Sequence, residues 1–156
     1  MNQLVRSQQL NWQPLIEANT DFGKNVGSTS LSFTSSNGKT AYNIGAEGGY
    51  FIKDNLAFKL GLGYGNNGIS GQETPIAYKI GAKYYLKKMI PIELSYNGVG
   101  IGSFDANPAY LGLQTGYALF FGKNVSIEPG VRYNKSMNTN FYNNNLQLNI
   151  GFVFHF

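Results

Sequence analysis

This chain of 156 residues has a composition unsuited to a domain surrounded by water. Charged residues make up 13% of it, against an average of about 25%. Glycine accounts for 20 of the 156 residues, well above its average share of about 7%. It has no cysteine, which excludes disulfide frameworks and thiolate metal sites, and no apolar run reaches the roughly 18 residues of a transmembrane helix. The net charge of +4 is scattered along the chain, so nucleic-acid binding is not indicated.

Most of the chain alternates between bulky apolar residues and small or polar residues, which is the two-residue period of a β-strand with two different faces. Gly, Asn, Asp, Ser and Pro separate the alternating segments, as turn residues do. Eight membrane-spanning strands of about ten residues would use roughly 80 residues and leave enough for turns, loops and tails. In chain order the predicted strands are 28–33, 42–50, 56–65, 76–86, 92–97, 111–121, 125–134 and 146–156.

The predicted connections alternate between short and long, as in up-and-down membrane barrels. We therefore expect an all-β fold, an eight-stranded antiparallel up-and-down transmembrane β-barrel, over residues 26–156. Residues 1–25 fall outside the pattern, and we expect them to form an N-terminal periplasmic tail or an interfacial segment around Trp12. The tight turns fall near 53–54, 87–88 and 123–124, and the longer connections fall near 35–39, 66–73, 101–107 and 135–143.

Charge gives a test of the two faces that was not used to define them. All seven ionisable residues inside the predicted strands other than His155 lie on the face of small residues, together with many of the glycines. A soluble barrel would turn the bulky face inward, whereas a membrane barrel would turn it toward lipid. Glycines on a solvated exterior would weaken the strands without any gain. Small residues do make room in the narrow interior of an eight-stranded barrel, so we favour the membrane barrel.

The inward polar residues are expected to pair with one another and to plug the lumen, because isolated charges in a narrow interior are costly. The alternative is a gate for small ions that opens when the pairs exchange partners. Three cross-strand pairs follow if each tight turn contains three residues: Glu47 with Lys59, Lys83 with Glu93, and Arg132 with Gln114. The whole predicted lumen charge network comprises Glu47, Lys59, Lys79, Lys83, Glu93, Gln114, Glu128 and Arg132.

Aromatic residues lie near both ends of the bulky face, where membrane barrels carry two interfacial girdles. Tyr and Phe favour strands in any case, so their placement at both ends is the informative feature. The predicted girdle at the end with long connections comprises Phe33, Tyr42, Tyr64, Tyr78, Tyr96 and Tyr133. The predicted girdle at the end with tight turns comprises Tyr50, Phe58, Tyr84, Phe121 and Phe154.

Two stretches resemble a known family. They are Gly-Tyr-Phe-Ile-Lys-Asp-Asn-Leu-Ala at 49–57, followed by Leu-Gly-Leu-Gly-Tyr at 60–64, and the alternating last strand that ends in an aromatic residue. The chain resembles, over about 26–156, the small eight-stranded outer-membrane barrels of Gram-negative bacteria, such as OmpX and the transmembrane domain of OmpA. The resemblance implies an outer-membrane location and an assembly signal, read by the barrel-assembly machinery, at Phe152, Phe154 and Phe156.

The same resemblance implies contact with outer-membrane lipid and lipopolysaccharide, and it leaves room for a membrane protein partner. The first residues, Met-Asn-Gln-Leu-Val-Arg, lack the apolar region of a signal peptide. We therefore expect Met1 to stand in place of a cleaved leader.

Motifs that carry chemistry are sparse. A serine nucleophile needs a base within hydrogen-bond reach, and the single histidine, His155, is expected to fill the lumen near the tight turns. One histidine without cysteines gives no metal-ligand cluster, so we expect no enzyme, metal or cofactor. The expected role is structural or interactive: envelope integrity, adhesion or an accessory subunit of an outer-membrane complex. The alternatives are a narrow passive channel for small solutes or ions and, second, a lipid A-modifying enzyme.

Overall fold

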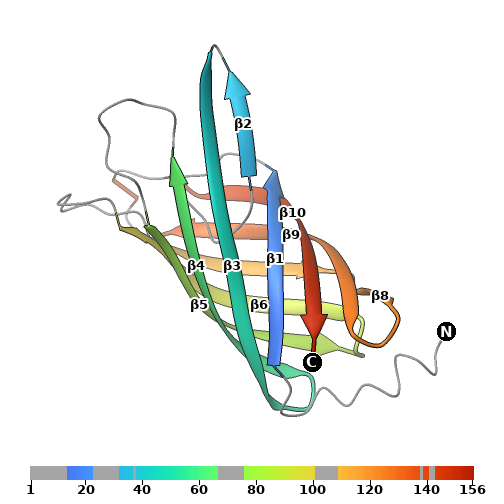
Figure 1. Ribbon diagram of the computed structural model, residues 1–156. Helices are drawn as coiled ribbons and strands as arrows, with labels where there is room; N and C mark the ends of the chain where they lie inside the picture. The colour runs from blue at the N-terminus through green and yellow to red at the C-terminus, as the bar shows by residue number, and fades with distance from the viewer. Residues whose placement is uncertain are drawn as a thin grey trace.

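The alternating segments of the sequence form antiparallel strands in a computed structural model, which describes residues 14–22, 32–36, 38–66, 76–100, 109–137, 139–140 and 143–156 (Figure 1). Buried and exposed residues alternate along the strands, so each strand presents one face to the interior and one to the outside. The strands are β1 (Pro14–Phe22), β2 (Ser32–Ser36), β3 (Lys39–Lys53), β4 (Leu56–Asn66), β5 (Ile76–Leu86), β6 (Ile90–Gly100), β7 (Ala109–Gly116), β8 (Leu119–Phe121), β9 (Val125–Ser136) and β10 (Asn145–His155).

Pairing of the first strand with both β10 and β3 closes the sheet into a barrel. Around the wall the strand order is β1-β10-β9-β7-β6-β5-β4-β3. The short β8 continues the path of β7 beside β9, so eight strands form the wall. All of these pairs are antiparallel, which confirms the predicted eight-stranded up-and-down barrel. Across the described ranges, the structure has no helix of the length and apolarity that a membrane crossing requires.

The strand that completes the wall is β1. The prediction that residues 1–25 lie outside the barrel is therefore wrong for Pro14–Phe22, which pairs with β10 along most of its length and with residues 47–50 of β3. Its inward Glu17 meets two lysines of the interior. These contacts across the seam explain why this segment belongs to the wall.

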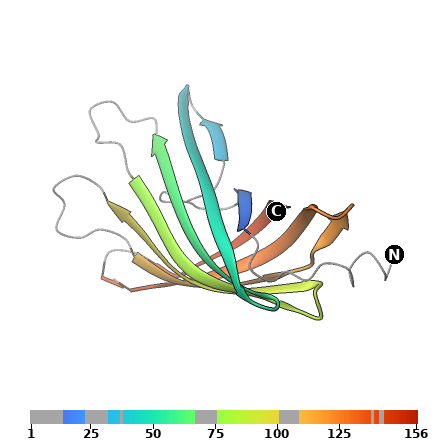
Figure 2. The same ribbon diagram turned by 60° about the horizontal axis from the view of Figure 1, so that its bottom comes forward.

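β2 extends the sheet beyond the closed part of the wall. It pairs with the first residues of β3 through a tight hairpin, in which Gly38 has φ +74°, a value that suits glycine. Both views show β2 beside the projecting part of β3 (Figures 1 and 2). The predicted first strand at 28–33 overlaps β2 at 32–33, and 28–31 lie outside the described residues.

One end of the barrel carries the tight turns at 54–55, 87–89 and 122–124; we call it the turn end and the opposite end the loop end. The first of these turns has two residues rather than three, with a β-bulge between Phe51 and Lys53. The cross-strand neighbour of Glu47 is consequently Gly61, two positions away from the predicted Lys59. A shift of two residues keeps every side chain on its face, because the strand period is two.

The other two expected cross-strand pairs are backbone neighbours. Lys83 lies opposite Glu93, and Gln114 lies opposite Arg132. The turns at 87–89 and 122–124 do contain three residues, which is the length that these two registers require.

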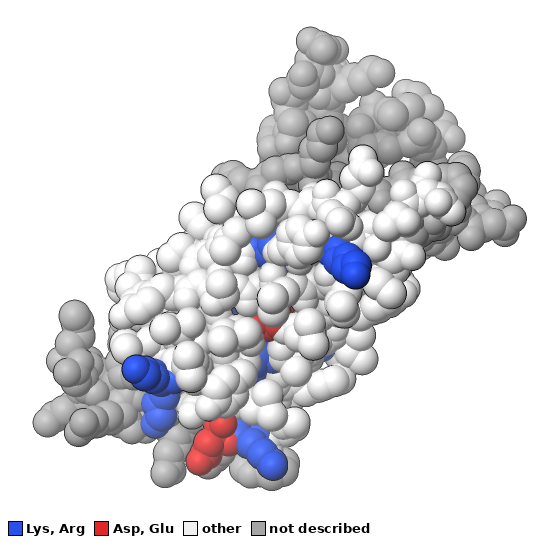
Figure 3. All heavy atoms as spheres, turned by 180° about the vertical axis from the view of Figure 1, so that it is seen from behind, with Lys and Arg blue, Asp and Glu red and all other residues white. Residues whose placement is uncertain are grey.

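The outer face of the barrel is apolar over most of its area. Leu62 is 69% exposed, and Leu60, Leu94, Leu113 and Leu148 are each more than half exposed. Figure 3 shows a broad surface with few charges, and charged side chains gather at one end of it. The charged side chains of the barrel are thus divided between its ends and its interior.

Candidate functional site

Three layers of side chains fill the interior of the barrel. Along β1 the successive inward residues from the turn end are Leu15, Glu17 and Asn19, and each belongs to one layer: apolar, charged and amide-bearing. All three are at most 1% exposed. An eight-stranded barrel has interior room for little more than side chains, so the layers occlude the lumen.

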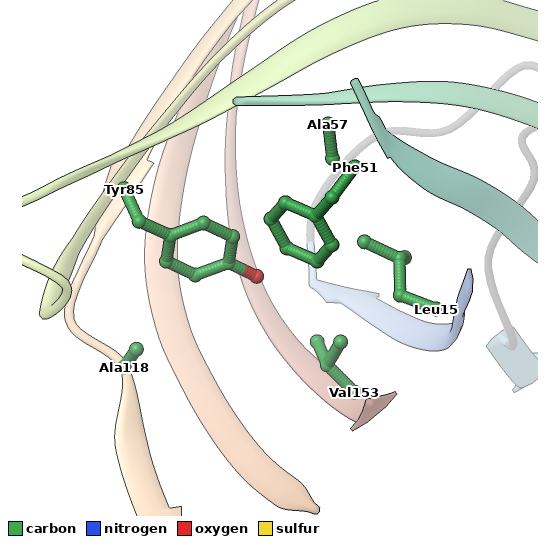
Figure 4. Packing of buried hydrophobic residues seen from close by; sticks show 6 residues of the cluster. All are labelled: Leu15, Phe51, Ala57, Tyr85, Ala118 and Val153. Carbon is green, nitrogen blue, oxygen red and sulfur yellow. The ribbon is translucent and has the colours of Figure 1, made fainter. Parts of the chain in front are cut away.

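The apolar layer closes the turn end. The rings of Phe51 and Tyr85 lie 6.0 Å apart, and the ring of His155 lies 6.1 Å from each of them. Figure 4 shows the side chains of this layer converging from different strands. The layer comprises Leu15, Phe51, Ala57, Tyr85, Ala118 and Val153.

Lys59 is the centre of the charged layer. Its Nζ lies 2.6 Å from Glu17 Oε2, 2.6 Å from Glu47 Oε2 and 2.8 Å from Glu93 Oε2. Glu17 and Glu47 stand directly opposite each other on β1 and β3, where the barrel closes. Like charges at such positions repel. The ammonium group of Lys59 contacts both carboxylates and converts that repulsion into a bridge across the closing seam.

The charged layer forms a continuous network rather than separate pairs. Ions taken out of water need ionic and hydrogen-bonding partners. Sharing each lysine between carboxylates gives every glutamate of the layer a cation, although Glu17 Oε1 has no hydrogen-bond partner among the described residues. The four glutamates of the layer face three lysines, and with Arg132 on β9 the described residues place four cations and four carboxylates in the interior. Two lysines continue the network from Lys59: Lys79 contacts Glu47 (2.9 Å) and Glu93, and Lys83 contacts Glu17 (3.0 Å) and Glu128.

Hydroxyl groups fix Glu128 at the border between the charged and apolar layers. Tyr85 Oη and Ser126 Oγ donate to its Oε1 at 2.8 and 3.0 Å. Ser126 Oγ also lies 3.1 Å from His155 Nε2. Because the Oγ proton goes to Glu128, Nε2 acts as the donor toward the serine, the reverse of what a nucleophilic serine needs from its base. This arrangement positions a carboxylate and does not activate Ser126.

The amide-bearing layer lies on the loop side of the charged layer and is less tightly bonded. Arg132 Nε donates to Gln114 Oε1 at 2.8 Å. The carboxamides of Asn19 and Asn149 are 0% and 2% exposed, yet neither has a hydrogen-bond partner among the described residues. Nearer the loop end, Asn134 donates to Asn145 and Gln147 at 2.8 and 2.9 Å, so incomplete bonding in this layer is confined to particular positions such as Asn19 and Asn149.

Three carboxylates of the charged layer converge as the ligands of a metal ion would. One oxygen from each of Glu17, Glu47 and Glu93 lies within 4.8 Å of the others. The Nζ of Lys59 contacts all three residues at 2.6 to 2.8 Å. An ammonium group thus occupies the position that a cation would take, and the cluster acts as an ion-pair network.

The residues predicted to form the lumen network all lie in the interior, from Lys59 at 0% exposed to Gln114 at 5%. Two of the three predicted pairs are in contact, Glu47 with Lys59 at 2.6 Å and Arg132 with Gln114 at 2.8 Å. The third is not, since the ammonium of Lys83 contacts Glu17 and Glu128 rather than its backbone neighbour Glu93. Glu17 is missing from the predicted network because residues 1–25 are predicted to form a tail or an interfacial segment outside the barrel. The alternation of apolar and polar residues along 14–22 was the signal that could have revealed it.

Aromatic residues predicted for the two girdles lie on the outer face. Tyr64 and Tyr133 toward the loop end are 52% and 46% exposed, and Tyr50 and Phe121 at the turn end are 45% and 60% exposed. The side chain of Phe33 lies outside the described residues. The remaining predicted members, Tyr42, Tyr78, Tyr96, Phe58, Tyr84 and Phe154, and the residues of the predicted assembly signal, Phe152, Phe154 and Phe156, are also exposed.

Comparison with known proteins supports the fold of this chain but does not assign a role to any of its residues. No family model and no curated protein matches the sequence. The structure is similar to the N-terminal β-barrel domain of OprF from Pseudomonas aeruginosa, with a TM-score of 0.60 and 13% sequence identity, over 94% of this chain and 98% of that one. At this identity the likeness shows that the two chains share a barrel fold over nearly their whole lengths.

Proposed function

We propose that this chain is an integral protein of the Gram-negative outer membrane with a structural or interaction role, such as envelope integrity, adhesion or membership of an outer-membrane complex. The observation that carries the proposal is the inverted distribution of polarity, with leucines on the outer face and ion pairs in the interior. A contiguous apolar exterior of this extent is unfavourable in water. A closed barrel in lipid leaves no backbone edge unpaired.

The layered lumen supports a role that does not involve conduction. An ion crossing the barrel would have to separate Lys59 from three carboxylates and then displace the packed rings of Phe51 and Tyr85. Outer-membrane lipid, lipopolysaccharide and the barrel-assembly machinery are the partners that we propose, with the outward Phe152, Phe154 and Phe156 as the assembly signal.

Membrane insertion can be tested on the outer face. Leu62, near the middle of β4, is exposed on that face, and Leu62→Arg would place a charge in lipid at a cost of about 2–4 kcal/mol. We expect this variant to fold poorly into phosphatidylcholine vesicles, as measured by the heat-dependent change in electrophoretic mobility. Lys123→Arg, in an exposed turn, is the matched control and should fold like the wild type. Equal folding of all three proteins would contradict insertion.

Activity measurements separate the proposed role from its alternatives. In planar bilayers we expect no discrete single-channel currents, and with added lipid A we expect neither deacylation nor acyl transfer. Reproducible current steps would favour the narrow channel. Modified lipid A would favour the enzyme. Cell fractionation with recovery outside the outer-membrane fraction would overturn the proposed location.

A further inference from the structure

Four lysines stand on the rim of the turn end, and the lumen network does not use them. Lys53 ends β3, Lys87 and Lys88 lie in the turn between β5 and β6, and Lys123 lies in the turn between β8 and β9. Three of them are exposed, and Lys88 is half-buried. Asp54 is the one acidic residue in the three turns. Within the ranges that the structure describes, no ion pair joins these lysines to a carboxylate.

Two of these lysines hold a backbone conformation that lysine rarely adopts. Lys87 has φ +52° and Lys88 has φ +59°, in the left-handed region that is unfavourable for residues with a Cβ. The other two turns meet the same need with Asn55 (φ +63°) and Gly122 (φ +76°), which are residue types that tolerate it. Two lysines in succession therefore cost backbone free energy, and strain of this kind points to a requirement for the side chains.

The four lysines border the apolar outer surface. Tyr50, Tyr84 and Phe121 precede the three turns by a few residues and point outward, with exposures of 45%, 43% and 60%. In membrane barrels such aromatic residues lie at the level of the lipid headgroups, so lysines just beyond them reach the phosphate groups. The apolar layer, with Phe51 and Tyr85, separates the rim from the lumen carboxylates.

We propose that the four rim lysines bind the phosphate groups of anionic phospholipids in the leaflet that surrounds the turn end. This inference rests on the proposed membrane insertion. The turns lie between β3 and β4, between β5 and β6, and between β8 and β9, so they are distributed along the wall. Charges spread around a rim match a ring of lipids better than a single macromolecular partner. Each lysine near an anionic membrane surface strengthens association about fivefold.

The test compares the lipids that contact the wild-type barrel with those that contact a variant of the strained turn. Spin-labelled phosphatidylglycerol and phosphatidylcholine report, by electron spin resonance, which lipid is immobilised at the protein in phosphatidylcholine vesicles. We expect the wild type to prefer phosphatidylglycerol several-fold at low salt. Because the Debye length falls to about 3 Å at 1 M salt, high salt should remove that preference.

The variant Lys87→Asn with Lys88→Gly gives two effects of opposite sign. Its preference for phosphatidylglycerol, averaged over the lipids around the barrel, should fall by about half, since two of the four charges are lost. Its urea midpoint of unfolding in phosphatidylcholine should rise, because Asn and Gly fit the left-handed conformation. Adding Lys53→Gln and Lys123→Gln should abolish the preference. Lys135→Asn, at an exposed position of β9 outside the turn end, is the matched control and should retain most of it.

A variant with an unchanged lipid preference, or with a lower urea midpoint, would show that the lysines serve the fold and would overturn the inference. Wild-type binding to peptidoglycan fragments without any lipid preference would overturn it as well, in favour of cell-wall carboxylates. Failure of the wild type to insert into the phosphatidylcholine vesicles would contradict the proposed function instead.

Discussion

The apolar layer and the charged layer occlude the same lumen by different physical means. In the apolar layer, Phe51 and its neighbours gain stability from the removal of surface from water, which is non-directional and is spread over many small contacts. In the charged layer, Lys59 alone contacts three carboxylates, and the loss of one partner leaves buried charge without compensation. Equal burial therefore does not imply equal tolerance of substitution.

The largest expected effect is that of Lys59→Met, which preserves most of the side-chain volume and removes the charge. Glu17, Glu47 and Glu93 would then face one another without their shared ammonium, at an expected cost of about 3–5 kcal/mol. The measurement is the free energy of unfolding in urea with the barrel in detergent micelles. Lys123→Met, in an exposed turn, should change it by about 0.5 kcal/mol or less.

The same comparison can be sharpened with a smaller side chain. Lys59→Ala removes both the ammonium and its stem, and it leaves oxygens of three glutamates within 4.8 Å of one another. Carboxylate oxygens suit Mn²⁺, so Mn²⁺ should raise the urea midpoint of this variant and leave that of the wild type unchanged. A Lys59→Met protein as stable as the wild type, or no response of Lys59→Ala to Mn²⁺, would show that the three glutamates do not depend on Lys59 as their shared cation.

Glu47→Ala should have the next largest effect. It deprives Lys59 and Lys79 of one carboxylate, at 2.6 and 2.9 Å, but each lysine retains Glu93. We expect a loss of about 2–3 kcal/mol, in the range for hydrogen bonds to charged groups, and a lower midpoint of heat unfolding in detergent. An unchanged midpoint would show that the remaining glutamates satisfy both lysines.

The charged layer separates what the sequence predicts, the face of each residue, from what it does not predict, the full set of partners of each residue. The face of Lys79 or Glu128 follows from the two-residue period, which holds whatever the turns contain. The partners of Lys59 depend on a two-residue turn at 54–55 and on the closing seam, which brings Glu17 to it across 42 positions of sequence. Local alternation carries no information about either. The barrel and the Glu47–Lys59 contact could therefore be predicted, whereas Glu17 and Glu93 as further partners of Lys59 could not.

β1 shows the same division. The sequence of β1 does alternate between apolar and polar residues over most of its nine positions. The Ser-rich segment at 28–33 shows a similar short alternation, so local pattern alone does not decide which of the two segments forms the first strand. What selects Pro14–Phe22 is the fit of Glu17 to the lysines and the pairing with β10 and β3 at once. Both are contacts between distant parts of the chain.

Phe51→Leu gives the corresponding test in the apolar layer. The substitution keeps an apolar side chain of somewhat smaller volume, so the surrounding Tyr85 and Leu15 can adjust, at a cost of about 1.5 kcal/mol or less. We expect a lower urea midpoint than that of the wild type and a higher one than that of Lys59→Met. Planar bilayers should still show no current steps, because the charged layer remains. A decrease in the urea midpoint as large as that of Lys59→Met would show that the two layers tolerate substitution equally poorly.

Asn149→Ala should have the smallest effect, although Asn149 is as deeply buried as the glutamates. Its carboxamide has no hydrogen-bond partner among the described residues, so truncation removes a polar group whose burial is unfavourable. The gain offsets the lost packing, and we expect the free energy of unfolding to change by about 1 kcal/mol or less. Gln114→Ala, which breaks a 2.8 Å bond to Arg132, is the matched control and should be more destabilising. The reverse order would mean that completeness of bonding does not rank the interior positions, and the contrast between the layers would then need another explanation.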